Sequence, residues 1–165
     1  MVILGIDPGY AILGYGVVNV NNNKLKVIDY GVIETKPDIR FPERLDKLYI
    51  GTKQLIEEFK PDHVAFEELF FARNVTTAIQ VGAGRGVSIL AAQQMGLPLY
   101  EYTPMQIKQS VCGNGHAEKM QIQQMVKMLL NLKSIPKPDD AADALGVAIC
   151  HANTLGPSLE EYRIK

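Results

Sequence analysis

The chain lacks the features that mark secreted, zinc-binding and membrane-spanning proteins. Its two cysteines, Cys112 and Cys150, have neither a paired spacing nor a metal motif, which argues against a disulfide framework and a cysteine zinc site. The three histidines have no metal-ligand spacing either. No apolar run reaches the roughly 18 residues that span a bilayer. Because no basic region precedes the apolar segment Val2–Leu4, we interpret it as a first strand and not as a signal peptide.

These absences favour a reduced cytoplasmic protein that has no membrane association. The length of 165 residues fits one domain, and a hydrophobic content of 47% is enough to fill its core. The sequence shows no internal repeat and no linker. We therefore expect a single domain over residues 1–154, followed by a loosely ordered C-terminal tail over residues 155–165.

The net charge of −1 argues by itself against a nucleic-acid partner, but the charges are unevenly distributed. Residues 1–68 carry a net charge of −3, residues 69–137 carry +5, and residues 138–165 carry −3. A basic middle between two acidic ends suits a polyanionic substrate. Ordinary surface variation explains the same distribution equally well, so the pattern does not decide between the two.

The apolar spacing predicts three strands followed by alternating helices and strands. Strand-like segments are rich in Val and Ile, and helical segments repeat their apolar residues at i, i+3 and i+4. Strands are expected over residues 2–7, 12–20, 25–34, 63–69 and 97–102, and helices over residues 42–59, 76–95, 104–111, the segment around 122–130, and 139–152. The fold class is therefore α/β, with a mixed five-stranded sheet whose first three strands are antiparallel and which helices flank.

Four carboxylates stand where a divalent-metal site would need them. Asp7 and Glu67 each end a short apolar run, and Asp140 and Asp143 lie one turn apart near the start of a helix. Sites in α/β proteins gather beyond strand ends, so Asp7 and Glu67 could meet there. Hard cations such as Mg²⁺ prefer oxygen ligands, and two metals can clamp both sides of a phosphodiester.

Two neighbouring acids complicate this assignment. Glu68 follows Glu67 directly, and strand alternation allows only one of the two to point at the site. Asp139 lies at i, i+4 from Asp143, so spacing alone does not reject it, and we interpret it as a cap or first-turn residue. Favourable interaction with the helix dipole could also account for Asp140, but not for Asp143, which lies a turn further in.

Several segments together resemble the RuvC family of Holliday junction resolvases. The similarity runs in order along nearly the whole chain, although each segment alone is a weak signal. The matching segments are Gly5–Gly9, Gly14–Gly16, Phe66–Asn74, Gly84–Gly86, Lys108–Val111, Ala117–Lys119 and Asp140–Leu145. The resemblance implies a ribonuclease-H-like fold and a homodimer. It further implies a metal-dependent endonuclease that resolves four-way DNA junctions by paired nicks during recombination and repair, leaving 5′-phosphate and 3′-hydroxyl ends.

The same resemblance assigns roles to individual residues. It selects Asp7, Glu67, Asp140 and Asp143 as catalytic metal ligands for Mg²⁺, two per site, with Mn²⁺ as a substitute. It also implies that cleavage is coupled to a branch-migration motor complex of the RuvA and RuvB type.

DNA-binding roles are expected for four residues in the middle of the chain. Phe70 would stack on unpaired bases, while its neighbour Phe71 would be partly buried. The other three, Arg73, Lys108 and Lys119, would contact the DNA, and Lys119 could share a phosphate with the helix start beside it. The alternative is that one Phe ring packs in the core and that the basic side chains are merely solvated.

Other functions stay open at this point. One alternative is a different ribonuclease-H-like nuclease that acts on structured RNA, like the YqgF group, which shares the Asp-containing first strand. Another is a non-catalytic binding module built on the same scaffold. An actin-like ATPase would need a second domain that 165 residues do not supply. Gly82, Gly84 and Gly86 lack the Gly-x-Gly-x-x-Gly spacing of a nucleotide loop, so we attribute them to close helix packing.

Overall fold

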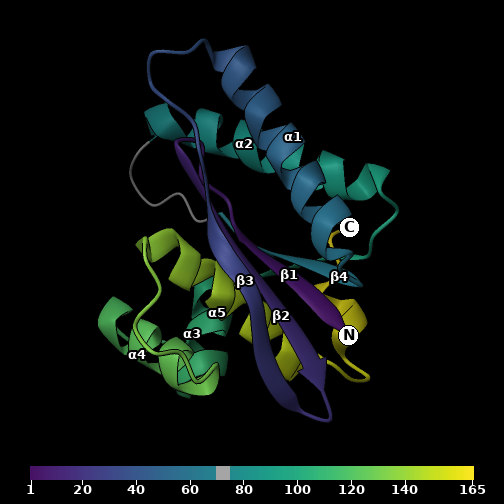
Figure 1. The fold of residues 1–165 in the computed structure, drawn as a ribbon, viewed down its shortest axis with the longest axis vertical. Coiled ribbons are helices and arrows are strands. Elements are labelled where there is room, and N and C mark those ends of the chain that lie inside the picture. The colour runs from purple at the N-terminus through teal and green to yellow at the C-terminus, as the bar shows by residue number, and fades with distance from the viewer. Residues whose placement is uncertain (70–74) are drawn as a thin grey trace.

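A five-stranded mixed sheet forms the centre of the computed structural model, which describes residues 1–69 and 75–165 (Figure 1). The spatial order of the strands is β3-β2-β1-β4-β5. The first three strands pair antiparallel, and β4 and β5 continue the sheet parallel to β1, as predicted. The strands are β1 (Val2–Asp7), β2 (Ile12–Asn21), β3 (Lys24–Glu34), β4 (His63–Glu67) and β5 (Leu99–Tyr102).

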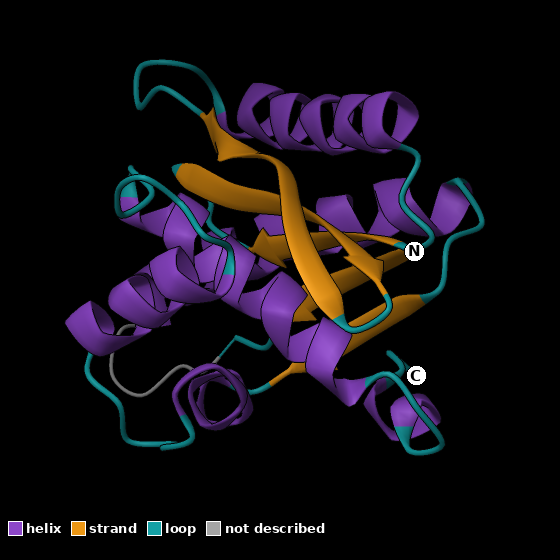
Figure 2. Ribbon diagram, turned by 60° about the horizontal axis from the view of Figure 1, so that its bottom comes forward, coloured by secondary structure: helices purple, strands orange, loops and turns teal. Residues whose placement is uncertain are grey.

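Helices cover both faces of this sheet (Figures 1 and 2). On one face lie α1 (Phe41–Phe59) and α2 (Val75–Gln94). On the other lie α3 (Pro104–Cys112), α4 (Lys119–Leu129) and α5 (Asp139–Thr154). Within the described ranges, no helix combines the length and the apolarity needed to cross a membrane.

Strand alternation divides the interior into two hydrophobic cores. Along β1, Ile3 packs in the core beneath α3, α4 and α5, whereas Leu4 and Ile6 pack in the core beneath α1 and α2. Both faces of the strand are thus buried, which explains its continuous apolar sequence. At the far end of the next hairpin, Asn22 and Asn23 have φ angles of 48° and 61°, the left-handed conformation that a tight two-residue turn between β2 and β3 requires.

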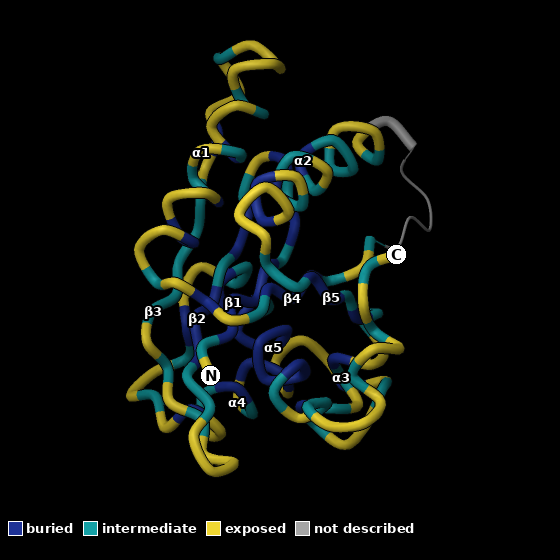
Figure 3. Tube along the Cα trace, turned by 90° about the vertical axis from the view of Figure 1, so that its right-hand side faces the viewer, coloured by how far each residue is buried: buried dark blue, intermediate teal, exposed yellow. Residues whose placement is uncertain are grey.

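Helix α5 lies directly on β1 and β2 and is the most deeply buried helix (Figure 3). Two glycines make this contact possible. A Cβ atom on Gly5 would lie 2.3 Å from the carbonyl oxygen of Ala144, and one on Gly14 would lie 2.1 Å from that of Asp140. Because real Cβ atoms do not approach so closely, any larger residue would push α5 away from the sheet.

A chain of hydrogen bonds crosses the buried side of α5. The Tyr102 hydroxyl lies 2.8 Å from Nδ1 of His151, and Nε2 of His151 lies 2.9 Å from Nδ1 of His63. Burial, and to a smaller extent His63, lower the pKa of His151 to about 3. The network therefore joins β4, β5 and α5 through neutral imidazoles.

The C-terminal tail differs from the loosely ordered segment that we expected. Residues Leu159–Tyr162 form a short 3₁₀ helix, and Arg163 makes a β-bridge with Tyr100. The N–H of Ile164 donates to the carbonyl of Leu99 at 2.9 Å. The tail thus covers the free edge of β5. A segment this short has no readable periodicity, and its partner strand is far away in the sequence.

The structure corrects the interpretation of the α2 glycines. Only Gly84 is in close packing, since a Cβ there would lie 3.1 Å from Leu48. Among the described residues, nothing lies within 4 Å of a Cβ built on Gly82 or Gly86.

Strand β4 ends at Glu67 rather than at residue 69, which leaves Glu68 just beyond the end of the strand.

Candidate active site

Two of the four predicted acids end neighbouring parallel strands at the same edge of the sheet. The register pairs Ile6 with Phe66, directly before Asp7 and Glu67. Ile6 and Phe66 pack in the core beneath α1 and α2, so alternation turns the next residue of each strand toward α5. Asp7 and Glu67 therefore leave the sheet side by side on the α5 face.

The start of α5 brings the other two acids to this edge. Gly14 pairs with Asp7 across β1 and β2, and the backbone of Asp140 rests on Gly14. This contact places the first turns of α5 beside Asp7. One turn further along, Asp143 is half-buried, with 25% of its side chain exposed.

A cavity of about 310 Å³ opens where these elements meet. Its charged lining comes from β1, β4, α3, α4 and α5, and its apolar lining comes from α3 and α4. The residues are Asp7, Glu67, Lys108, Lys119 and Asp143, together with Pro104, Ile107 and Ile122.

Two predicted or alternative acids lie outside this lining. Asp140 does not line the cavity, although its charge acts on Asp7. Glu68 is exposed and borders a different cavity near the C-terminal tail.

Burial and like-charge repulsion act together on the carboxylates. Burial, followed by the charges of Glu67, Asp143 and Asp140, raises the pKa of Asp7 to about 8. Burial and the charge of Asp143 raise the pKa of Glu67 to about 7, against the opposing effect of Lys108 and Lys119. Burial also raises the pKa of Asp143. Burial and mutual repulsion therefore disfavour the charged forms of these carboxyl groups.

Lys119 forms an ion pair with one of these acids, Asp143. Its ammonium nitrogen lies 3.1 Å from Oδ2 of Asp143 and 3.6 Å from Oδ2 of Asp139. Burial acts to lower the pKa of Lys119, but the hydrogen bond to Asp143 and the two carboxylate charges outweigh it and raise that pKa. Asp139 also accepts a hydrogen bond from Lys137 at 2.7 Å, so it is held on the surface by two lysines.

The chemistry of the donor set fits a hard divalent cation. All four acids offer carboxylate oxygens, the ligands preferred by Mg²⁺ and Mn²⁺. Within the described residues, no three His, Cys, Asp or Glu side chains converge closely enough to form a metal centre as they stand. The ammonium of Lys119 lies beside Asp143 and compensates part of the charge that a cation would compensate.

The predicted DNA-binding residues divide into two groups. Lys108 and Lys119 both line the cavity that contains the acids. Phe70 and Arg73, with Phe71, lie outside the described residues. Sequence reasoning missed the apolar wall made by Pro104, Ile107 and Ile122, because apolar residues at helical spacing look like ordinary core positions.

Comparisons with known proteins agree on one family. The family described as crossover junction endodeoxyribonuclease RuvC matches residues 3–151. The protein of that name from Ruminiclostridium cellulolyticum is 57% identical over 154 residues, covering 93% of each chain. The one from Alkaliphilus oremlandii is 56% identical over 165 residues, covering 100% of both.

A solved structure shows the same similarity in three dimensions. Thermus thermophilus RuvC in complex with Holliday junction substrate superposes with a TM-score of 0.91 at 36% identity, covering 99% of both chains. The ribonuclease-H-like fold predicted from the sequence is thus confirmed, and so is the predicted resemblance. The acids at one sheet edge and a match along nearly the whole length lead to one conclusion: the chain belongs to the RuvC family of crossover junction endodeoxyribonucleases.

Proposed function

We propose that this protein is a magnesium-dependent endonuclease that resolves four-way DNA junctions by paired nicks during recombination and repair, leaving 5′-phosphate and 3′-hydroxyl ends. The observation that carries the proposal is the meeting of acids and lysines around one cavity in a chain of this family. The family name describes crossover junction cleavage, and the Thermus thermophilus relative was solved with a Holliday junction substrate. We expect the protein to act in the cytoplasm.

Asp7, Glu67, Asp140 and Asp143 would hold the metal. When bound, two Mg²⁺ ions would supply an activated water and charge stabilisation for the leaving oxygen. Support comes from the raised pKa values of Asp7 and Glu67, because a bound cation would stabilise the charged forms that burial and repulsion disfavour. Mn²⁺ would serve as well, since it accepts the same oxygen ligands.

The chain's own basic and aromatic residues would position the substrate. Lys108 and Lys119 stand on the rim of the acidic cluster, where a phosphate could approach the acids without facing uncompensated negative charge. For Phe70 we retain the proposal that its ring stacks on unpaired bases at the crossover, and for Arg73 that it contacts the backbone nearby. The apolar wall of the cavity would limit the access of bulk water.

A homodimer with two-fold symmetry would match the symmetry of a four-way junction. Helix α2 offers a surface for it. Four of its residues recur at helical spacing on one face, and this stripe consists of Ile79, Ala83, Gly86 and Leu90. Ile79 is 74% exposed and Leu90 is 48% exposed, and the open space around Gly86 would allow a second helix to approach. The dimer would work with a branch-migration motor complex of the RuvA and RuvB type.

Changing the α2 stripe tests the dimer. Ile79→Asp should convert the protein into a monomer, because the new charge would be left unpaired within an apolar interface. Sedimentation equilibrium measures the change, and Ile28→Asp, an exposed apolar position on β3, is the matched control that should leave the mass unaltered. A dimer that survives Ile79→Asp unchanged would place the interface elsewhere.

The cleavage reaction itself is tested with labelled substrates. A four-way DNA junction should be nicked at paired positions in Mg²⁺ and left intact in EDTA, and a ligase should reseal the nicks. A linear duplex and a structured RNA are the comparison substrates. Preferential cleavage of the RNA would favour the YqgF-like alternative and contradict the proposal.

Substitution of the two cavity lysines should weaken junction binding in a salt-dependent way. Each phosphate contact contributes about 0.9 to the slope of log affinity against log salt on duplex DNA. Lys108→Ala and Lys119→Ala should each reduce that slope by about one unit, measured by fluorescence anisotropy in Ca²⁺ over a salt series. Lys53→Ala on α1, on the opposite face of the sheet, is the control. An unaltered slope in both cavity variants would show that these lysines do not contact DNA.

A further inference from the structure

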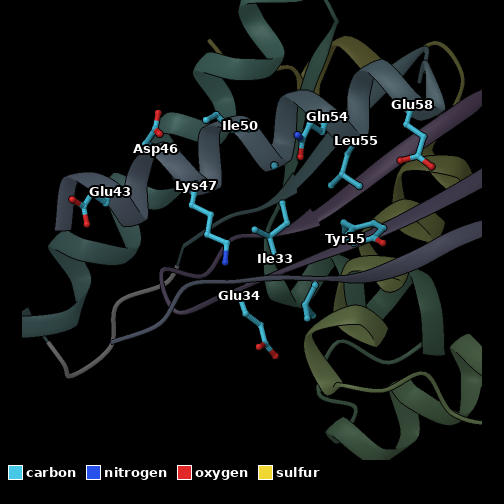
Figure 4. Close-up of a pocket in the computed structure, with 12 residues that line it drawn as sticks. Tyr15, Ile33, Glu34, Glu43, Asp46, Lys47, Ile50, Gln54, Leu55 and Glu58 are labelled. Carbon is cyan, nitrogen blue, oxygen red and sulfur yellow. The ribbon is translucent and has the colours of Figure 1, made fainter. Parts of the chain in front are cut away.

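The free edge of the sheet at β3 and the adjacent helix α1 enclose a groove on the face opposite the candidate active site (Figure 4). The groove has a volume of about 710 Å³. Ile33, Ile50 and Leu55 give it an apolar floor, and Ile50 is 43% exposed. Gly51 holds α1 close to the strand, since a Cβ there would lie 2.7 Å from Cδ1 of Ile33.

The second half of β3 presents unused backbone groups at this groove. Among the described strands, β3 pairs only with β2. The N–H of Thr35 donates to the carbonyl of Ala11 at 2.8 Å, which identifies this opposed pair as a hydrogen-bonded one. In an antiparallel ladder such pairs alternate, so the N–H and C=O groups of Val32 and Glu34 point away from β2.

The first half of β3 is protected against pairing and the second half is not. Lys24 and Lys26 are exposed near its start, and Ile28 is the extra residue of a β-bulge opposite Val17 and Val18. Edge lysines and bulges are common devices that prevent a strand from accepting another. Residues 30–34 carry neither device, so pairing with another strand is open only beside the groove.

The charges around the groove select a basic partner. The Tyr15 hydroxyl donates to Oδ2 of Asp29 at 3.0 Å. Burial, this hydrogen bond and the charges of Asp29 and Glu58 together raise the pKa of Tyr15 to about 12, so both carboxylates act at one end of the groove. In the described part of the chain, Asp29, Asp46 and Glu58 have no basic partner within 4.0 Å, whereas Glu43 pairs with Arg40. Lys47 is the single basic residue of the lining.

We propose that the edge of β3 binds an extended, basic segment of a partner protein by strand addition. The segment's backbone would pair with Val32 and Glu34, and one aliphatic side chain would cover Ile33 and Ile50. A Lys or Arg of the segment would reach the carboxylates of Asp29 and Glu58. DNA is an unsuitable occupant because its phosphates would face these acids. The surface therefore leaves the opposite, basic-rimmed cavity free for the junction.

A short peptide in which Val and Arg take alternate positions and Thr fills the positions between them is the probe, because Val and Arg then lie on the same face of the extended segment. Added to the ¹⁵N-labelled protein, it should shift the amide signals of residues 30–34 and of α1, and should slow hydrogen exchange at Val32 and Glu34. Two altered peptides separate the contributions: Glu in place of Arg removes the charge match, and N-methylation of alternate residues blocks strand pairing. Both should bind at least about fivefold more weakly, the loss expected for one backbone hydrogen bond or charge contact.

Variants of the protein provide the reciprocal test. Val32→Pro removes an outward N–H at an edge position that tolerates proline, and it should lose the peptide by at least about fivefold. Val32→Thr, which keeps that N–H, should bind the peptide normally. Glu58→Gln should weaken binding of the plain Arg-containing peptide and leave binding of the Glu-containing peptide unaltered. All three should cleave junctions at the unmodified rate. Equal binding of the N-methylated and plain peptides would overturn the proposal even if Val32→Pro failed to fold. So would self-association that depends on Val32, because the occupant would then be a second copy of the chain.

Discussion

Exchanging any one of the four acids for its amide should reduce junction cleavage by about 10³-fold or more and leave junction binding nearly intact. An amide keeps the size of the side chain but removes its charge, so it should weaken metal binding and the stabilisation of the transition state, a loss of several kcal/mol at about 1.4 kcal/mol per tenfold. The variants are Asp7→Asn, Glu67→Gln, Asp140→Asn and Asp143→Asn. Single-turnover cleavage in Mg²⁺ measures the rate, and anisotropy in Ca²⁺ measures binding.

A second readout separates metal binding from catalysis. In EDTA, Asp7→Asn and Glu67→Gln should melt at a higher temperature than the unmodified protein, because the substitution removes a carboxyl group whose charged form is disfavoured by burial and by the neighbouring acids. Adding Mg²⁺ should raise the Tm of the unmodified protein but not that of the variants. A variant that cleaves at the normal rate would remove its residue from the site.

The neighbouring acids are the matched controls for this prediction. Glu68→Gln and Asp139→Asn should keep substantial activity, since Glu68 borders a different cavity and Asp139 is held on the surface by Lys137 and Lys119. An inactive Glu68→Gln together with an active Glu67→Gln would reverse the assignment of the strand-end ligand.

A single methyl group on Gly14 should also reduce cleavage strongly, although Gly14 carries no functional group. Its Cβ would lie 2.1 Å from the carbonyl oxygen of Asp140, so either β2 or the start of α5 must move. A displacement of about 1 Å at a catalytic centre can cost about 10²-fold in rate. The overpacking should also lower the free energy of unfolding by about 1–3 kcal/mol. Gly14→Ala is measured by junction cleavage and urea denaturation, under conditions where the variant is fully folded.

Gly146, a glycine within α5 itself, is the matched control. A Cβ on Gly146 would lie 3.5 Å from Cγ2 of Ile107, an ordinary van der Waals contact. Gly146→Ala should therefore cleave junctions normally, and it should gain up to about 1 kcal/mol of stability from its higher helix propensity. Equal cleavage rates for Gly14→Ala and the unmodified protein would mean that the fit of α5 on β2 does not position the acids.

The sequence by itself predicted the strands and the helices, because these follow from local patterns, and the family resemblance selected the four acids. Apolar periodicity located β1 and β4, and in the structure Asp7 and Glu67 are the last residues of these strands. Alternation along a strand also separates Glu67 from Glu68, which the structure places on different cavities. In the same way, the sequence predicted a helix from residue 104, and the structure begins α3 there with Thr103 as the N-cap of a capping box.

Only the tertiary structure decided how these residues meet. The contact of α5 with Gly5 and Gly14 sets the distance between its acids and those of the strands, and no local pattern contains that distance. Asp140 falls outside the cavity lining while Asp143 falls within it, although both lie on one helix face. The ion pair of Lys119 with Asp143 and the contact of the tail with β5 likewise join segments that are distant in sequence, and the open edge of β3 follows from the order of all five strands. Periodicity reports which side of an element is buried, whereas the partner that covers it is chosen by the packing of the whole chain.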